Sequence, residues 1–364
     1  MTTTTTSTVA DPLPMLRLDA VTKTFPVRRG VRKGKVSAVD QVSLEVQPGS
    51  TMGIVGESGC GKSTLARVVV GLYPADSGQI TFDGQTLRNG KKRPRKVIEQ
   101  MQMVFQDPYS ALNPRASIGE AIGFPLRVQG VGSSETAERV AAMLEEVGLH
   151  SNYANYYPHQ LSGGQRQRVN IARALVLQPR LIVLDEAVSA LDKSIQAQIL
   201  NLLQELQEAH QLTYLFISHD LNVVEYMSGQ VAVMYLGQVV ESCSSAALYE
   251  KPRHPYTQGL LASIPKIDPR ERAPKTIAVK GEMPSPLNPP SGCRFRTRCP
   301  HAMDTCARVT PKLAAIEPGH YVACHLYSPD LPQPRAIPKD LQDQLTLVNL
   351  TATSTTSSST NEGD

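Results

Sequence analysis

Several features that mark secreted, membrane-spanning or nucleic-acid-binding chains are missing from this sequence. Its apolar runs all fall short of the ~18–20 residues that a membrane-spanning helix requires. The opening stretch, MTTTTTSTVADPLP, has neither the basic nor the apolar region of a secretory signal. We therefore expect the chain to stay in the cytosol, where thiols remain reduced and a disulfide framework is not expected. A net charge of +4 is too small to indicate nucleic acid as a partner by itself.

What the sequence does contain is typical of a folded protein with unstructured ends. Hydrophobic residues make up 41% of the chain and charged residues 19%, as in ordinary globular proteins. No internal repeat has the spacing of a solenoid. The threonine-rich start and the final TATSTTSSSTNEGD cannot bury enough apolar surface to fold. We predict that residues 1–14 are disordered and that residues 331–364 are largely so.

A glycine-rich loop between a short apolar run and a helical pattern is the strongest functional signal. The stretch MGIVGESGCGKSTLARVVVGL, residues 52–72, fits the pattern G-x-x-x-x-G-K-[ST] of a phosphate-binding loop. Glycines let successive backbone N–H groups turn toward phosphate oxygens, and the following helix adds its positive end. Lys62 would reach the β- and γ-phosphates, and the Ser63 hydroxyl would ligate Mg²⁺. The predicted contacts to ATP and Mg²⁺ are Gly56, Glu57, Ser58, Gly59, Cys60, Gly61, Lys62, Ser63 and Thr64.

Two carboxylates follow a second apolar strand. In RLIVLDEAVSALD, residues 180–192, the apolar run Leu181–Leu184 ends at Asp185 and Glu186. Because successive side chains of a strand point to opposite sides, the two carboxylates can take different tasks. Asp185 is predicted to hold the Mg²⁺ shell, and Glu186 to polarise a water in line with the γ-phosphate.

The stretch LSGGQRQRVNIARAL, residues 161–175, decides between families that share these two elements. Ser162, Gly163 and Gly164 precede an amphipathic helix, which gives a second anion-binding helix start. Here residues from about 15 to 330 resemble the ATP-binding-cassette (ABC) ATPases, whose signature is LSGGQ.

The resemblance implies roles for further residues. Phe25 would stack on adenine, Gln106 would sense Mg²⁺ and the γ-phosphate, and His219 would contact the γ-phosphate. SALD, residues 189–192, resembles the family's D-loop. In that family the signature of one subunit, here Ser162, Gly163, Gly164 and Gln165, covers ATP held by another subunit in a head-to-tail dimer. Since Gln106, Glu186 and His219 are all present as catalytic residues, we expect the chain to hydrolyse ATP.

The task coupled to hydrolysis has two alternatives: a motor of a membrane transporter, or a soluble ABC protein that acts on DNA or the ribosome. Only about 55 residues separate Gln106 from the signature, enough for a small helical subdomain that grips a transporter. Long coiled-coil heptads, a zinc hook, a DNA-reading insertion and a second cassette are all missing from the sequence. The transporter is therefore the favoured interpretation.

Within transporters, the stretches FPVRRG, QDPYSALNPR, SALDKSIQAQILNLL and KPRHPYTQGLL resemble ATPases of the peptide/nickel importer group. The opening stretch and NPR resemble the F-type ATPase of dipeptide and oligopeptide systems. This resemblance implies a D-type sister ATPase, two transmembrane permease subunits and an extracytoplasmic solute-binding protein, with no nucleic acid. It also implies a peripheral place on the cytoplasmic face of the inner membrane. Nickel, glutathione and opine import are the alternatives.

Four of the six cysteines lie near the end of the chain. Cys293, Cys299, Cys306 and Cys324 have the spacing C-x₅-C-x₆-C-x₁₇-C, unlike the paired C-x₂-C of common zinc ribbons. A [4Fe–4S] cluster is favoured, with zinc and free or oxidisable thiols as alternatives, and the importer group carries this pattern. His301, His320 and His325 are close enough in sequence to replace a cysteine. Three arginines, Arg294, Arg296 and Arg298, would offset the negative charge of the cluster.

The predicted fold class is α/β. The resemblance implies an ABC-type P-loop ATPase core over residues 15–250, with a mixed sheet flanked by helices and an antiparallel β subdomain. A helical subdomain is expected over residues from about 107 to 165. Proline-rich sequence predicts a loop-rich extension that contains the four cysteines over residues 251–330.

Overall fold

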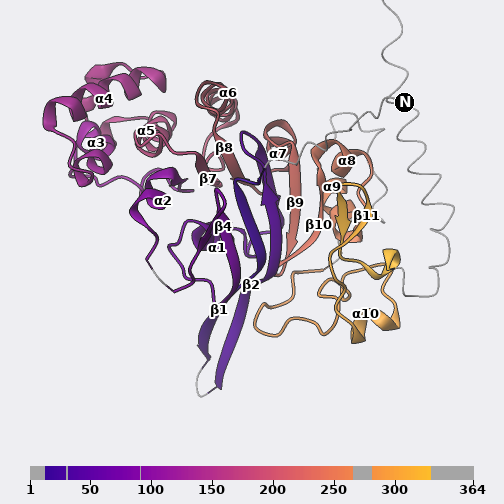
Figure 1. Cartoon of the computed structure of the whole chain (residues 1–364). Helices are drawn as coiled ribbons and strands as arrows, with labels where there is room; N and C mark the ends of the chain where they lie inside the picture. The colour runs from indigo at the N-terminus through magenta and orange to yellow at the C-terminus, as the bar shows by residue number, and fades with distance from the viewer. Residues whose placement is uncertain (1–12, 30–31, 91, 265–280, 329–364) are drawn as a thin grey trace, which may run out of the picture.

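A computed structural model of the chain describes residues 13–29, 32–90, 92–264 and 281–328 (Figure 1). The disorder predicted for 1–14 and 331–364 falls on residues outside this description, apart from 13 and 14.

A four-stranded antiparallel sheet in the order β2-β1-β4-β5 opens the fold. It consists of β1 (Leu16–Arg29), β2 (Arg32–Val46), β4 (Ser77–Phe82) and β5 (Gln85–Leu87). Apolar and polar residues alternate along β1 and β2, as in LRLD and VSLEV, so one face of the hairpin is apolar. That face is buried against α1 (Lys62–Val69) and one face of the larger sheet.

The larger sheet has eight strands in the order β11-β12-β10-β9-β3-β8-β7-β6. Its parallel part is β3 (Thr51–Val55), β6 (Met101–Val104), β7 (Leu181–Asp185), β8 (Thr213–Ile217) and β9 (Gln230–Tyr235). The strands β3, β7 and β8 are buried along their whole length, as expected where both faces of a parallel sheet are covered. Because β3, β7 and β8 are neighbours and parallel, the loops that follow them meet at one edge of the sheet.

Helices cover the sheet and form a subdomain at one end of the molecule. The subdomain contains α3 (Ile118–Val128), α4 (Ser133–Glu146) and the start of α5 (Gly163–Leu175), with the short 3₁₀ helices η1 (Ser151–Asn155) and η2 (Pro158–Gln160). The remaining helices of the core are α2 (Arg95–Gln100), α6 (Lys193–His210), α7 (Leu221–Met227) and α8 (Ser245–Glu250). No helix in the described part of the chain is long and apolar enough to span a bilayer.

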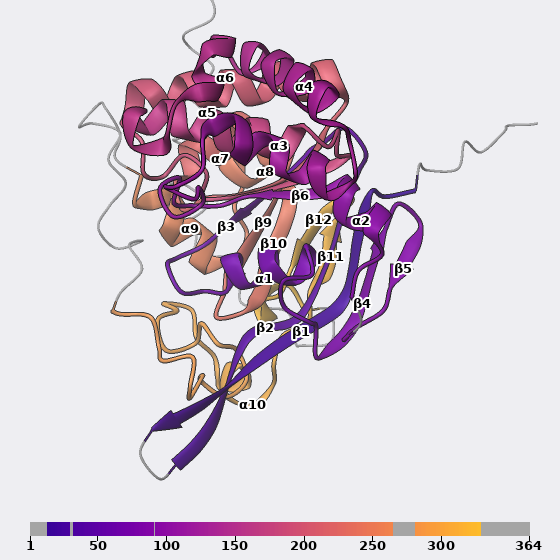
Figure 2. The same ribbon diagram turned by 90° about the vertical axis from the view of Figure 1, so that its left-hand side faces the viewer.

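The C-terminal extension is attached to the large sheet at the edge opposite β6. It contains α9 (Pro255–Ala262), α10 (Asp304–Arg308), β11 (Ala314–Glu317), β12 (His320–Val322) and the 3₁₀ helix η5 (His325–Tyr327). The strand β12 pairs antiparallel with β10 (Gln238–Ser244), with Glu241 opposite Val322. Both views place α10 far from the α3–α4 pair (Figure 1, Figure 2).

The predicted fold class is confirmed: a mixed sheet flanked by helices lies beside a separate antiparallel sheet. The proline-rich sequence predicts loops in the extension, whereas two of its segments, β11 and β12, join the main sheet. These strands are only four and three residues long, and such short segments carry no periodic signal.

Candidate nucleotide-binding site

The glycine-rich loop connects β3 to α1 and forms one wall of a cavity of about 250 Å³. Ser58–Thr64 line this cavity together with Gln106, Glu186 and Gly237. Two of the loop glycines are required sterically. A Cβ atom on Gly56 would lie 2.3 Å from the carbonyl oxygen of Met234, and one on Gly61 would lie 2.0 Å from that of Ala38. The loop therefore depends on close backbone approach at both glycines.

Three side chains at the loop have the positions needed for a phosphate and its cation. Lys62 is 4% exposed, and its ammonium donates to the carbonyl oxygen of Gly56 at 2.7 Å. The Ser63 hydroxyl donates to Oδ1 of Asp185 at 2.7 Å. Burial raises the pKa of Asp185, against the hydrogen bond from Ser63. A carboxylate beside a hydroxyl is a suitable oxygen donor set for Mg²⁺.

Glu186 is oriented by side chains from two other strand ends. Its Oε2 accepts a hydrogen bond from Nε2 of Gln106 at 2.9 Å and lies 3.1 Å from Nδ1 of His219. Gln106 follows β6, and His219 follows β8. The backbone of Glu186 has a φ of +48°, in the left-handed region that non-glycine residues rarely adopt. The structure thus brings together the three predicted catalytic residues at one edge of the sheet.

The predicted signature residues do not line the cavity of their own chain. Ser162 is the N-cap of α5: its hydroxyl accepts from the backbone N–H of Gln165 at 3.3 Å. The Gln165 side chain accepts in return from the backbone N–H of Ser162 at 2.9 Å, which completes a capping box. Ser162 is exposed, Gly163 is partly exposed and Gly164 is buried. The helix start is therefore rigid and open on one side.

Phe25 also lies outside the phosphate cavity. Its ring packs edge-on against Tyr73, with centroids 5.4 Å apart and an interplanar angle of 78°. The ammonium of Lys23 lies 5.5 Å from the same ring. Stacking of Phe25 on adenine stays a prediction.

The four C-terminal cysteines line one small pocket. Cys293, Cys299, Cys306 and Cys324 share it with His254, His301, Phe295 and His325. None of the six cysteines forms a disulfide. Burial raises the pKa of Cys299 to about 11 and that of Cys324 to about 12, so both thiols are protonated in the absence of a metal.

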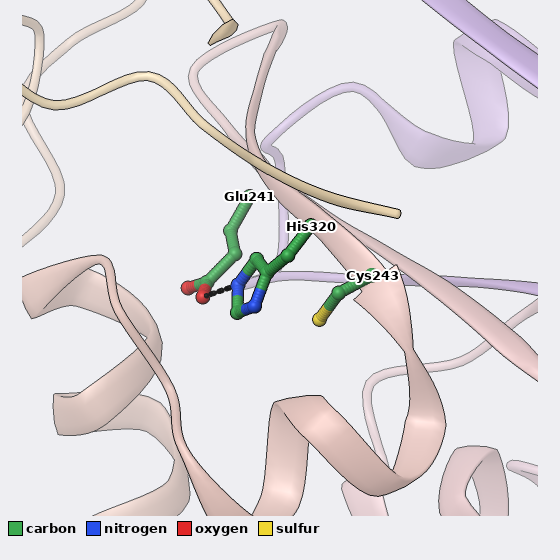
Figure 3. Close-up of side chains that lie close together, drawn as sticks. All are labelled: Glu241, Cys243 and His320. Carbon is green, nitrogen blue, oxygen red and sulfur yellow. Dashed lines mark hydrogen bonds and ion pairs between the residues drawn. The ribbon is translucent and has the colours of Figure 1, made fainter. Parts of the chain in front are cut away.

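Three buried side chains that the sequence does not predict as a cluster, Glu241, Cys243 and His320, lie where β12 joins β10 (Figure 3). The Glu241 carboxylate accepts from Nε2 of His320 at 2.8 Å and from the backbone N–H groups of Arg253 and His254 at 2.7 and 2.9 Å. The Cys243 sulfur lies within 4.8 Å of both side chains, and burial raises the pKa of its thiol to about 12. Three donors satisfy the carboxylate, so we assign this group a structural role. No local motif in the sequence signals it, since its members are up to 79 positions apart.

The three histidines that could replace a cysteine ligand lie in two different places. His301 and His325 line the cysteine pocket, whereas His320 is engaged by Glu241. Two of the three arginines expected to offset the charge of a cluster instead form ion pairs with the ATPase core. Arg294 pairs with Asp40, and Arg298 pairs with Glu57.

Comparison with known proteins agrees with this geometry. Residues 39–189 match the family described as ABC transporter, and residues 240–306 match the oligopeptide/dipeptide transporter C-terminal region. The oligopeptide transport ATP-binding protein AppF of Bacillus subtilis is 50% identical over 328 residues, which cover 88% of this chain and 100% of AppF. The putative oligopeptide transport ATP-binding protein YkfD of the same organism is 48% identical over 86% of this chain and 96% of its own length.

Solved structures show the same fold. The ATP-binding cassette MJ0796, in a dimeric post-hydrolysis state bound to ADP and Pi, is 29% identical, with a TM-score of 0.56 over 64% of this chain and 99% of that one. CbiO1 from Clostridium perfringens, part of the ABC transporter complex cbiONQ, has a TM-score of 0.56 at 28% identity, over 65% of this chain and 91% of that one. The chain thus belongs to the ABC transporter ATP-binding proteins that carry the oligopeptide/dipeptide C-terminal region, and it is an ATPase whose hydrolysis of ATP is coupled to transport.

Proposed function

We propose that this chain is the ATP-hydrolysing subunit of an importer for dipeptides and oligopeptides. It works in a head-to-tail dimer with a D-type sister ATPase, at the cytoplasmic face of the membrane, beneath two permease subunits served by an extracytoplasmic solute-binding protein. The convergence of Gln106, Glu186 and His219 at the phosphate loop carries the catalytic part of the proposal. The names of the similar proteins support peptides over nickel, glutathione or opines as the cargo.

Hydrolysis is assigned to the chain's residues as follows. Loop N–H groups and Lys62 bind the β- and γ-phosphates. Ser63 and Asp185 would hold Mg²⁺, which would supply positive charge beside the phosphates. Glu186 orients a water and takes its proton as the water oxygen attacks the γ-phosphorus. The bond from that phosphorus to the β–γ bridging oxygen breaks, and ADP leaves. Gln106 and His219 hold the Glu186 carboxylate in place through the contacts at 2.9 and 3.1 Å.

A second cavity supports docking to a permease. It has a volume of about 660 Å³ and lies between β6 and the helical subdomain. Apolar side chains on its rim are exposed: Phe124 at 61%, Leu72 at 56% and Ile98 at 51%. Gln106 and Asp185 line the floor of the same cavity. We assign it to a helix of the permease, because a partner there would contact the apolar rim and the hydrolytic residues together.

Uptake of a labelled oligopeptide by cells tests this assignment. In a strain that lacks its own copy of the gene, the wild-type chain should restore uptake, and Phe124→Glu should lower it at least ~10-fold because a charge is placed in an apolar interface. Binding of ATP by the purified variant should not change. The control is Tyr321→Glu, an exposed aromatic on β12. Full uptake with Phe124→Glu would contradict the docking site, and wild-type cells that import nickel in place of peptides would contradict the cargo.

We propose that the cysteine pocket holds a [4Fe–4S] cluster, with zinc as the alternative. Four thiols line one pocket with little water access. Their spacing, C-x₅-C-x₆-C-x₁₇-C, differs from the paired C-x₂-C of common zinc ribbons. The four cysteines would hold the cluster, whose binding displaces the thiol protons.

Metal analysis of anaerobically purified protein tests this proposal. We expect a brown protein with about four irons per chain, the content of one [4Fe–4S] cluster. Cys324→Ser should lose most of the iron, whereas Cys243→Ala should keep it, since Cys243 lies outside the pocket. A colourless protein with stoichiometric zinc would exclude the cluster, and a metal-free protein would leave free thiols as the answer.

A further inference from the structure

The C-terminal extension makes a direct ionic contact with the phosphate-binding loop. The Arg298 guanidinium donates to Oε2 of Glu57, the second residue of the loop, at 3.0 Å. The side chain of Arg298 is 7% exposed and that of Glu57 is 26% exposed, so the pair is largely shielded from water. Water and salt screen such a pair less than they screen a surface salt bridge.

A second contact fixes the backbone of the same loop residue. The N–H of Glu57 donates to the hydroxyl of Tyr256 at 2.9 Å, and Tyr256 lies on α9 of the extension. Its ring is fully buried and packs 5.4 Å from Phe295 and 4.7 Å from Tyr235. The phenol is thus held in place by the aromatic residues around it.

Further contacts connect the extension to the rim of the nucleotide cavity. Arg294 pairs with Asp40 and donates to the carbonyl oxygen of Leu236. Next along the chain, the Gly237 N–H donates to the carbonyl oxygen of Cys60 in the phosphate loop at 2.7 Å. Pro286 of the extension lines the cavity itself. The extension therefore contacts the nucleotide site from several directions.

The extension is anchored well enough to hold the loop. The buried Glu241–His320 pair fixes β12 to β10 (Figure 3). The same carboxylate accepts from the backbone N–H groups that precede α9. The ring of Phe295 is 2% exposed and belongs to the main core. Because buried contacts fix the C-terminal extension, it can hold the phosphate-binding loop in one position.

The ion pair matters for nucleotide binding because Glu57 places a negative charge in the phosphate loop. A carboxylate in a loop that binds a triphosphate repels the ligand unless a cation neutralises it. Arg298 provides that cation from 241 positions away in sequence. Removal of the arginine would leave a partly buried, unpaired anion next to Ser58, the first loop residue that lines the nucleotide cavity.

We propose that Arg298 is a positioning residue of the nucleotide site: it neutralises Glu57 and holds the phosphate loop in its binding conformation, so the extension is part of the ATP site. The proposal rests on the proposed function, in that the loop binds ATP. It makes no assumption about the metal in the cysteine pocket.

Calorimetric titration of the full chain with Mg-ATP tests the proposal. Arg298→Ala should raise the Kd about 10-fold, which corresponds to about 1.4 kcal/mol. Glu57→Gln in the Arg298→Ala background should bring the Kd back to within about 3-fold of wild type, since the uncompensated charge is then absent. Arg298→Lys should recover part of the affinity. The matched control is Arg296→Ala in the same loop, whose side chain donates to the carbonyl oxygen of Ser291 and which should leave the Kd unchanged.

The outcomes separate this proposal from the one it rests on. An Arg298→Ala variant that binds ATP as tightly as Arg296→Ala overturns the positioning role. A double variant as weak as Arg298→Ala also overturns it, because the arginine would then act through packing alone. Lys62→Ala should abolish binding; if it does not, the nucleotide site itself is wrong. Thermal melts of every variant identify loss of folding.

Discussion

Replacement of Glu186 by glutamine is expected to lower ATP turnover at this chain's own nucleotide site by about 10²–10⁴-fold, the range lost with a general base. Glutamine keeps the size of the side chain but cannot take a proton from the attacking water. Binding of ATP should survive, because Lys62 and the loop N–H groups are untouched. Unhydrolysed ATP should then hold the two ATPase subunits together. The measurements are phosphate release, nucleotide retention and the mass of the complex with ATP and Mg²⁺.

Glu45→Gln is the control for loss of a carboxylate. Glu45 is 48% exposed on β2 and pairs with Arg17 at 3.2 Å, away from the cavity. Turnover of this variant should equal that of wild type. Glu186 would lose its assigned role if Glu186→Gln released phosphate at the wild-type rate. A variant that failed to bind ATP at all would point to a role in folding or binding.

The second large effect is expected at Ser162. Aspartate caps a helix as well as serine does, so Ser162→Asp should preserve α5. In the proposed head-to-tail dimer the new carboxylate would face the triphosphate held by the partner ATPase. Hydrolysis at that one site should then fall at least ~100-fold, as with loss of an electrostatic contact to the reacting group. The Kd of the isolated chain for ATP should stay at the wild-type value, because Ser162 does not line its own cavity. This split between binding in one chain and hydrolysis in the pair is specific to action across an interface.

Ser162→Asn is the matched variant, since asparagine also caps helices, has the size of aspartate and carries no charge. Its hydrolysis should be much closer to wild type than that of Ser162→Asp. Equal activities for the two variants would show that no phosphate lies close to Ser162. A changed Kd in the isolated aspartate variant would place the signature in its own chain's site.

The parts of the site that the sequence predicted are those encoded by contiguous residues. GESGCGKST predicts a strand, a loop and a helix in a fixed order, and the positions of Lys62 and Ser63 follow from that order. Glu186 could be located because it directly follows the fully buried strand β7, and His219 because it comes two residues after the fully buried strand β8. Parallel neighbours then bring those strand ends to one edge of the sheet.

The contacts that the sequence did not predict join segments that are far apart. The sequence predicts that Arg298, with Arg294 and Arg296, offsets the negative charge of a cluster held by the cysteines. In the structure its side chain reaches Glu57 at 3.0 Å, because pairing of β12 with β10 brings the extension to the phosphate loop. The same pairing buries Glu241 and His320 together. No local pattern encodes either contact, since both depend on which edge of the sheet the chain returns to.

The long separation between Glu57 and Arg298 also has a consequence for biosynthesis. A ribosome adds roughly 5–20 residues per second, so the 241 positions between the two residues take roughly 12–50 s to translate. During that interval a nascent chain carries the phosphate loop without the arginine that neutralises it. If Arg298 has the proposed role, a nascent chain that ends before it would bind ATP about 10-fold more weakly than the full chain, so full affinity would be reached only late in translation.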